Sequence, residues 1–203
     1  INRALAARSG PMLPFVAETG GLNTMIVDST ALPEQVVDDV IASAFLSAGQ
    51  RCSALRILYV HSELAEKIIT MLKGAMMQLR VGDPADLDTD VGPLIDADAL
   101  GTVEGHIAQL TEAGALIARC DVPLNLPQGH YLGPQVFEIS SIRELKREIF
   151  GPVLHIVRYA QAELPKVVEE INQSGYALTL GVHSRIDGFA RQIFAATRAG
   201  NTY

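Results

Sequence analysis

The sequence predicts an α/β fold, a three-layer α/β/α domain built on a mostly parallel sheet. Short apolar runs bounded by Gly, Asp or Pro are typical of buried strands. Longer segments carry apolar residues at spacings of three and four, which is typical of amphipathic helices. The two kinds of segment alternate along the chain. Strands separated by helical segments need crossover connections, and these connections produce parallel strands with helices on the faces of the sheet.

The first part of the chain predicts a helix, a loop, a strand and a longer helix. The Ala-rich residues 2–8 are compatible with a short helix, which Gly and Pro residues then interrupt. The apolar run 25–27 predicts a buried strand. Pro33 favours a helix start, and an apolar stripe continues to residue 48, so that Gly49 is placed to cap the helix.

The remaining chain continues this alternation around two long loops. Residues 83–93 form an acidic loop with Gly and Pro, and residues 120–135 predict a long surface connection. The other predicted elements are strand 57–60, helix 64–79, helix 100–110, strand 115–118, strand 153–159, helix 164–171, strand 178–183 and helix 189–197.

The composition bounds the class of protein. The 203 residues suit one large or two small domains, and 48% of them are apolar, enough for a sizeable core. The net charge of −7 is the wrong sign for binding nucleic acid or an anionic membrane surface. No apolar run reaches the ~18 residues of a spanning helix, and no export signal opens the sequence. Because the first residue is Ile1, we expect the sequence to begin inside a longer polypeptide.

Two cysteines, Cys52 and Cys120, are too few for a disulfide framework. An acidic chain without an export signal fits a reducing compartment, so we expect a cytoplasmic protein. Cys120 has no reactive context in the sequence and is interpreted as an inert thiol. The histidines show no metal-ligand spacing, and we predict no metal site.

Cys52 and Glu18 are the strongest candidates for chemistry. Both lie in loops at the ends of predicted elements, where α/β sheets place functional groups. A thiol reacts as its thiolate, which the adjacent Arg51 and nearby backbone N–H groups would favour. A carboxylate on a Gly-Gly turn near this thiol would serve as a general base toward water. A Cys beside an Arg is also compatible with a buried structural residue.

Three segments carry a family resemblance: residues 18–23 (Glu-Thr-Gly-Gly-Leu-Asn), 49–52 (Gly-Gln-Arg-Cys) and 148–153 (Glu-Ile-Phe-Gly-Pro-Val). In the same order, they resemble the signature segments of the NAD(P)-dependent aldehyde dehydrogenase superfamily. Residues 81–84 and 91–94 resemble its recurring connecting segments. The similarity continues to the end of the sequence, so the resemblance covers essentially the whole chain.

A finer resemblance points to one subgroup. Residues 17–21, 26–35 and 47–56 are similar to the dehydrogenase part of bifunctional proline-utilisation proteins. That part oxidises L-glutamate γ-semialdehyde, the open form of 1-pyrroline-5-carboxylate, to L-glutamate. The resemblance implies the aldehyde dehydrogenase catalytic-domain fold, NAD as cofactor, a small-molecule aldehyde as substrate and a proline dehydrogenase domain in the same polypeptide. A homo-oligomer is compatible with it.

The resemblance implies that Cys52 is the nucleophile and Glu18 the general base. The thiolate adds to the aldehyde carbon, the thiohemiacetal loses a hydride to NAD⁺, and a thioester remains. Glu18 then deprotonates the water that hydrolyses the thioester. The backbone N–H of Cys52 is one donor to the oxyanion, whereas the family's second donor, an Asn side chain, would lie before Ile1.

The resemblance also implies binding roles. Glu148 matches the carboxylate that hydrogen-bonds the nicotinamide ribose, and Phe150 matches the aromatic residue beside the same group. Gly20 is also assigned to cofactor binding, because a glycine allows close approach of the backbone. Ser53, next to the nucleophile, is assigned to the substrate.

The same resemblance divides the chain and leaves two alternatives open. Residues 1–16 are the expected residual end of a missing cofactor-binding domain, and residues 17–203 the catalytic domain, truncated at its C-terminus. Because most cofactor contacts would lie upstream, the fragment alone could be a non-catalytic folded or self-associating module that binds NAD⁺ weakly or not at all. A Cys-dependent hydrolase would instead use Cys52 with a histidine such as His61 as its base.

Overall fold

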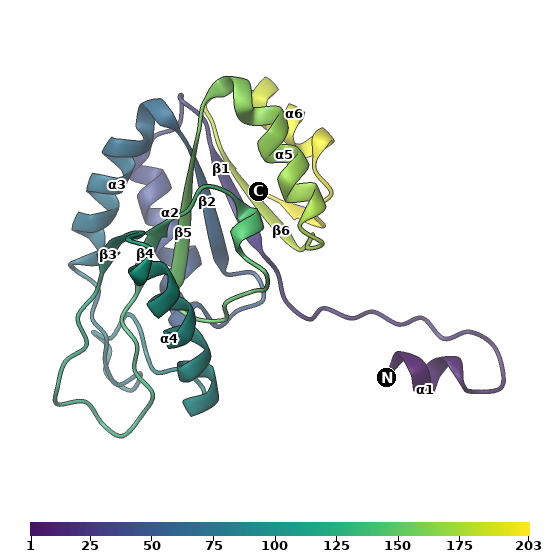
Figure 1. The fold of residues 1–203 in the computed structure, drawn as a ribbon, viewed down its shortest axis with the longest axis horizontal. Coiled ribbons are helices and arrows are strands. Elements are labelled where there is room, and N and C mark those ends of the chain that lie inside the picture. Colours follow the sequence, from purple (N-terminus) through teal and green to yellow (C-terminus); the bar gives the residue numbers. More distant parts are fainter.

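The computed structural model describes residues 1–203 and contains a seven-stranded sheet in the order β3-β4-β5-β2-β1-β6-β7 (Figure 1). All neighbouring strands are parallel except β3 and β4. The predicted mostly parallel sheet is therefore confirmed. The strands are β1 (Asn23–Val27), β2 (Leu55–His61), β3 (Leu116–Arg119), β4 (Gln135–Glu138), β5 (Val153–Tyr159), β6 (Thr179–His183) and β7 (Asn201–Thr202).

Helices cover both faces of the sheet, as the predicted three-layer fold requires (Figure 1). α2 (Pro33–Phe45) and α3 (Ser62–Met76) pack on one face, and α4 (Ala97–Glu112) contributes to the same core. α5 (Leu164–Gln173) and α6 (Asp187–Ala196) pack on the other face. None of the helices is both long enough and apolar enough to span a lipid bilayer.

Alternate residues of the central strands face opposite cores. In β1, Met25 and Val27 belong to the core beneath α2 and α3, whereas Ile26 belongs to the core beneath α5 and α6. In β2, Leu58 and Tyr59 divide in the same way. Because successive strand side chains point to opposite faces, a strand buried on both faces must be apolar at nearly every position. This explains the continuous apolar runs from which these strands were predicted.

Helix α2 ends at Phe45, before the predicted residue 48, and Gly49 is not its cap. A 3₁₀ turn follows in which Ser47 (φ 58°), Ala48 (φ 51°) and Gly49 (φ 65°) are all left-handed, so the α-helix cannot continue. A Cβ added at Gly49 would lie 2.2 Å from the carbonyl oxygen of Gly151. The glycine is therefore required where two loops approach each other.

The prediction also omitted two strands, and it made α3 too long as it did α2. β4 follows the Pro-rich connection and pairs with β3 and β5, while β7 has two residues and pairs with β6. Both strands are short, and their partners come from distant parts of the sequence, which local propensity does not capture. α3 ends at Met76, short of the predicted residue 79.

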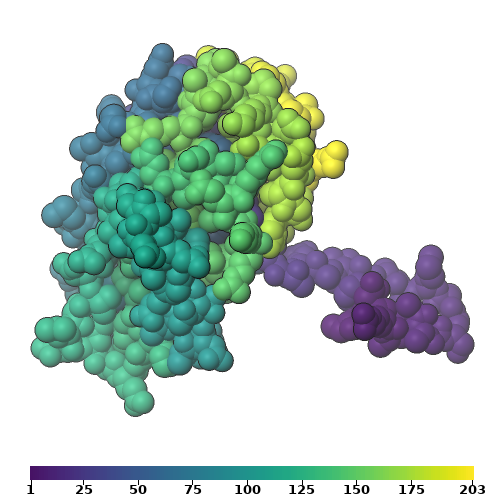
Figure 2. All heavy atoms as spheres, viewed as in Figure 1, coloured from purple at the N-terminus to yellow at the C-terminus, as the bar shows by residue number.

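Residues 1–20 form an N-terminal arm that projects from the rest of the molecule (Figures 1 and 2). The arm contains α1 (Asn2–Ala6), which has no buried residue, and then a stretch without regular secondary structure. Its apolar side chains at Ile1, Met12 and Val16 are at least 80% exposed. The arm therefore contributes nothing to either core.

Candidate active site

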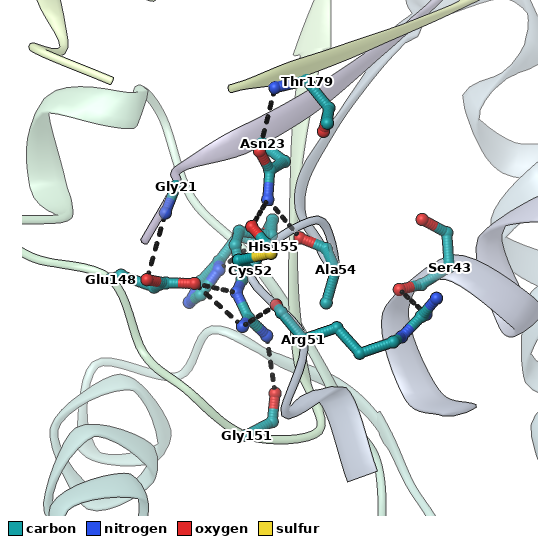
Figure 3. A network of polar contacts seen from close by, with 11 residues as sticks. Gly21, Asn23, Ser43, Arg51, Cys52, Ala54, Glu148, Gly151, His155 and Thr179 are labelled. Carbon is teal, nitrogen blue, oxygen red and sulfur yellow. Dashed lines mark hydrogen bonds and ion pairs between the residues drawn. The ribbon is translucent and has the colours of Figure 1, made fainter. Parts of the chain in front are cut away.

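The three segments identified in the sequence meet at one edge of the sheet (Figure 3). Gly21 lies before β1, Cys52 before β2 and Glu148 before β5, and these three strands are neighbours in the sheet. Because parallel strands begin at the same edge, their preceding loops lie together. The site therefore lies at the amino ends of the strands. This is the edge opposite to the carboxyl ends, where ligands of open α/β sheets usually bind.

Cys52 is exposed on the turn between α2 and β2. The adjacent Arg51 side chain points away from it (Figure 3), and its Nη2 donates to the carbonyl oxygens of Ala42 at 2.8 Å and Ser43 at 2.9 Å. These carbonyls belong to the last turn of α2. This guanidinium therefore caps the carboxyl end of the helix, and the expectation that Arg51 favours the thiolate stays a prediction.

Asn23, which the sequence analysis did not single out, holds the loop of Cys52 in place. Its Nδ2 donates to the carbonyl oxygens of Cys52 at 2.7 Å and Ala54 at 2.9 Å, and its Oδ1 accepts from the N–H of Thr179 at 3.2 Å. The residue is 2% exposed. A buried amide needs partners for its donors and acceptor, so an Asn that opens an apolar strand was the signal available in the sequence.

Glu148 is tied to the turn that carries Gly20 and Gly21. Its Oε2 accepts from the N–H of Gly21 at 3.1 Å, and its side chain is 11% exposed. Gly20 has φ 135°, and a Cβ added there would lie 2.1 Å from Oε2 of Glu148. A side chain at position 20 would therefore displace the Glu148 carboxylate, while the cofactor-binding role of Gly20 stays a prediction.

Arg56 is a second residue that the sequence analysis missed. It is buried, and its Nε and Nη2 donate to Oε1 of Glu148 at 3.2 and 2.9 Å. Its Nη1 donates to the carbonyl oxygen of Gly151 at 3.0 Å, and Nη2 also donates to that of Arg51 at 3.3 Å. Burial lowers the pKa of Arg56, against the hydrogen bond and charge of Glu148, which raise it. An Arg inside an apolar strand requires such a partner, which is the signal that the sequence offered.

Two histidines extend this network away from the site. Nδ1 of His155 lies 2.9 Å from the carbonyl oxygen of Arg56, and its Nε2 lies 2.8 Å from Nε2 of His106. Because a carbonyl can only accept, Nδ1 of His155 is the donor, and its Nε2 accepts the proton of His106. Burial lowers the pKa of His155 to about 3, so the ring is neutral. The backbone of Arg56 is thereby fixed as well as its side chain.

The other predicted site residues, Glu18, Ser53 and Phe150, are less closely connected to this network. Glu18 is exposed on the arm, where it forms no hydrogen bond or ion pair, and it lies three residues before Gly21. Ser53 is half-buried directly after Cys52. Phe150 is 43% exposed, with Cζ of Arg56 at 5.3 Å from the centre of its ring. The network thus joins Gly21, next to Gly20, with Glu148 and the loop of Cys52, but it does not include Glu18.

Cys120 lies outside this site. It is half-buried, and its Sγ donates to the carbonyl oxygen of Met76 at 3.1 Å. Burial raises the pKa of this thiol to about 11, which keeps it protonated near neutral pH. No cluster of three or more His, Cys, Asp or Glu side chains is arranged to hold a metal ion.

Comparisons with known proteins agree with the resemblance. The family model described as "Aldehyde dehydrogenase family" matches residues 1–203. The bifunctional protein PutA of Klebsiella aerogenes is 49% identical over 211 residues, which cover 100% of this chain and 16% of that protein. Its counterpart in Escherichia coli (strain K12) is 46% identical with the same coverage.

Solved structures show the same relationship. A crystal structure of bifunctional proline utilization A (PutA) protein superposes with a TM-score of 0.93 at 49% identity, covering 100% of this chain and 20% of that one. This chain therefore spans between 16% and 20% of the length of these relatives. The fold class predicted from the sequence is confirmed. Residues 1–203 belong to the aldehyde dehydrogenase family.

Proposed function

We propose that residues 1–203 are the catalytic part of an NAD⁺-dependent aldehyde dehydrogenase that oxidises L-glutamate γ-semialdehyde to L-glutamate. In this proposal residues 1–16 are the end of a cofactor-binding domain, and residues 17–203 belong to the catalytic domain. Both are part of a longer polypeptide that also contains proline dehydrogenase. One observation carries it: the Glu148 carboxylate joins the Gly20-Gly21 turn to the Cys52 loop through Arg56. The similarity to PutA proteins supports the substrate.

The residues of the site fit the nicotinamide end of the cofactor. Oε2 of Glu148 accepts a single hydrogen bond, from Gly21, so a lone pair on this oxygen is available to a ribose hydroxyl. The exposed ring of Phe150 offers an apolar surface beside this carboxylate. Bound NAD⁺ supplies the acceptor for the hydride that leaves the substrate carbon.

Cys52 supplies the covalent chemistry. Its exposed Sγ, as the thiolate, forms a bond to the aldehyde carbon, and the carbonyl electrons move to the oxygen to give a thiohemiacetal alkoxide. The backbone N–H of Cys52 donates to this oxygen. When the hydride leaves, the oxygen regains its double bond, and an acyl thioester on Cys52 remains.

Glu18 completes the cycle by accepting a proton from water, which attacks the thioester carbon and releases the carboxylic acid and the Cys52 thiolate. The chain geometry allows this role, because three residues span at most about 11 Å and Gly21 is fixed to Glu148. In this proposal Ser53, the residue after Cys52, contacts the aldehyde substrate.

The geometry disfavours a hydrolase that uses Cys52 with a histidine base. Cys52 precedes β2 and His61 ends it, which separates them by about 20 Å at ~3.3 Å per residue. His155 lies nearer the site, but its Nδ1 proton is held by the Arg56 carbonyl and its Nε2 by His106.

The proposal is tested by NADH formation in the complete polypeptide that contains residues 1–203. We expect glutamate semialdehyde to support NAD⁺ reduction, and Cys52→Ala to abolish it. Cys120→Ala is the matched control and should retain the activity, because that thiol lies outside the site. Unchanged NADH production by Cys52→Ala would refute the assignment.

A further inference from the structure

The guanidinium of Arg56 contacts both halves of the proposed site, and its partners Arg51, Glu148 and Gly151 are labelled in Figure 3. It donates to the carboxylate that faces the cofactor and to a carbonyl of the nucleophile loop. The Arg56 side chain is 1% exposed. Since water does not reach it, these bonds have no solvent substitute.

The carbonyl contacted in the nucleophile loop belongs to the same peptide group as the N–H of Cys52. This oxygen, on Arg51, also accepts from the N–H of Ala54 at 3.1 Å. In a planar trans peptide the C=O and N–H point in opposite directions, so fixing the oxygen fixes the direction of the N–H. A cation at the oxygen also polarises the amide and strengthens its N–H as a donor.

We infer that Arg56 is a positioning residue that orients the Cys52 N–H toward the developing oxyanion and at the same time holds Glu148 toward the cofactor. The inference rests on the proposed function. Arg56 acts through these two partners and does not touch the reacting atoms itself. One side chain, Arg56, thereby controls both the direction of the Cys52 N–H and the position of the Glu148 carboxylate.

The arrangement requires an arginine. Its planar fork carries donors on three nitrogen atoms, which here reach Glu148, Gly151 and Arg51. A lysine has one nitrogen, and that atom cannot occupy these positions at the same time. The hydrogen bond from His155 fixes the backbone from which the fork extends.

The test uses the complete polypeptide as wild type, Arg56→Lys, Glu148→Gln and the double variant. The first quantity measured is KM for NAD⁺ during aldehyde oxidation. The second is the rate of Cys52 acylation by p-nitrophenyl acetate without cofactor. In that reaction the thiolate sulfur bonds to the acetyl carbon and p-nitrophenolate leaves, so its absorbance reports the rate.

Arg56→Lys should lower the acylation rate about tenfold or more, because the oxyanion donor loses its orientation. Each single variant should raise KM for NAD⁺ about tenfold. The double variant should raise KM no further, because both substitutions remove the same interaction.

Multiplicative effects on KM in the double variant, or an acylation rate for Arg56→Lys within about twofold of the wild type, would overturn the inference. Arg158→Lys is the matched control, because Arg158 also pairs with glutamates, Glu138 and Glu66, but at the other end of β5. We expect both quantities to be unchanged in it. If circular dichroism shows that Arg56→Lys does not fold, Arg56→Gln is measured in its place.

The two proposals fail in different ways. A wild type that reduces no NAD⁺ with glutamate semialdehyde refutes the proposed function. The acylation rates still decide whether Arg56 orients the Cys52 peptide, since that reaction needs neither the cofactor nor the aldehyde. An active wild type in which Arg56→Lys behaves like Arg158→Lys refutes the inference alone.

Discussion

The side-chain amide of Asn23 donates a 2.7 Å hydrogen bond to the carbonyl oxygen of Cys52. Asn23 opens β1, and Cys52 lies in the loop before the neighbouring strand β2. The bond therefore ties the proposed nucleophile to the rigid edge of the sheet, and a second bond to Ala54 makes the attachment bidentate.

Replacement of Asn23 by leucine should destabilise the fold. Asn23→Leu keeps the approximate side-chain volume but leaves the part-buried carbonyl of Cys52 and the buried carbonyl of Ala54 without this donor. We expect a cost of about 2–4 kcal/mol in the free energy of unfolding. Urea denaturation measures the change. Asn172→Leu is the control, since Asn172 also bridges two segments but at exposed hydrogen bonds, and about 1 kcal/mol or less is expected. Equal losses in the two variants would contradict the role of Asn23.

Replacement of Gly20 by alanine should weaken cofactor binding. The added Cβ would lie 2.1 Å from Oε2 of Glu148, so the carboxylate must move from its place. We expect KM for NAD⁺ to rise about tenfold, the loss typical of one hydrogen bond to a charged group. Gly10→Ala separates this clash from backbone strain, because Gly10 has φ 115° with nothing near its added Cβ. KM should stay unchanged in Gly10→Ala, and a rise there equal to that of Gly20→Ala would refute the explanation.

The two thiols should react at very different rates. Cys52 is exposed, whereas burial raises the pKa of Cys120 to about 11. At about pH 8 only roughly one Cys120 in a thousand is then a thiolate. Iodoacetamide followed by peptide mass spectrometry should label Cys52 first, with Cys120 labelled faster as the pH approaches 11. Cys52→Ser supplies the control, in which early labelling disappears. Preferential labelling of Cys120 at neutral pH would contradict the structure.

Acid should destabilise the fold through His155. Burial lowers its pKa from 6.5 to about 3 in the folded state, so between these values the unfolded chain binds a proton that the folded chain does not. The free energy of unfolding therefore falls as the pH falls, by at most about 1.4 kcal/mol per pH unit for this group. His155→Asn keeps a donor for the Arg56 carbonyl but cannot titrate. Its stability, measured by urea unfolding, should fall less between about pH 7 and pH 4 than that of the wild type. Identical slopes would rule out His155 as the source.

The strands buried on both faces were predictable because burial on both faces produces short apolar runs, as at residues 25–27 and 57–60. Cys52, Glu148 and Gly20 were predicted from the sequence motifs around them. The structure connects the loops that carry them, and their roles stay predictions. Glu18 was identified in the same way, but it lies on the exposed arm, so its role stays a prediction.

Asn23 and Arg56 escaped prediction because their roles depend on partners far away in the sequence. Asn23 bonds residues about 30 positions later and Thr179 beyond them, and Arg56 bonds Glu148 at a separation of 92 residues. The direction of the Arg51 side chain was also beyond local reasoning, because it follows from the left-handed turn at Ser47 that lays this residue against α2. The spacing of residues along the chain predicts that a residue lies in a loop, but it does not predict the direction of its side chain.

The position of the site at the amino ends of the strands has an electrostatic consequence. A helix that connects two parallel strands runs back against them, so α2 brings its carboxyl end, with partial negative charge, toward the loop of Cys52. That field opposes the alkoxide that forms during the proposed reaction. The Arg51 guanidinium rests on the Ala42 and Ser43 carbonyls and compensates part of this negative end. Arg51 therefore neutralises part of a helix terminus from the far side of the Cys52 loop.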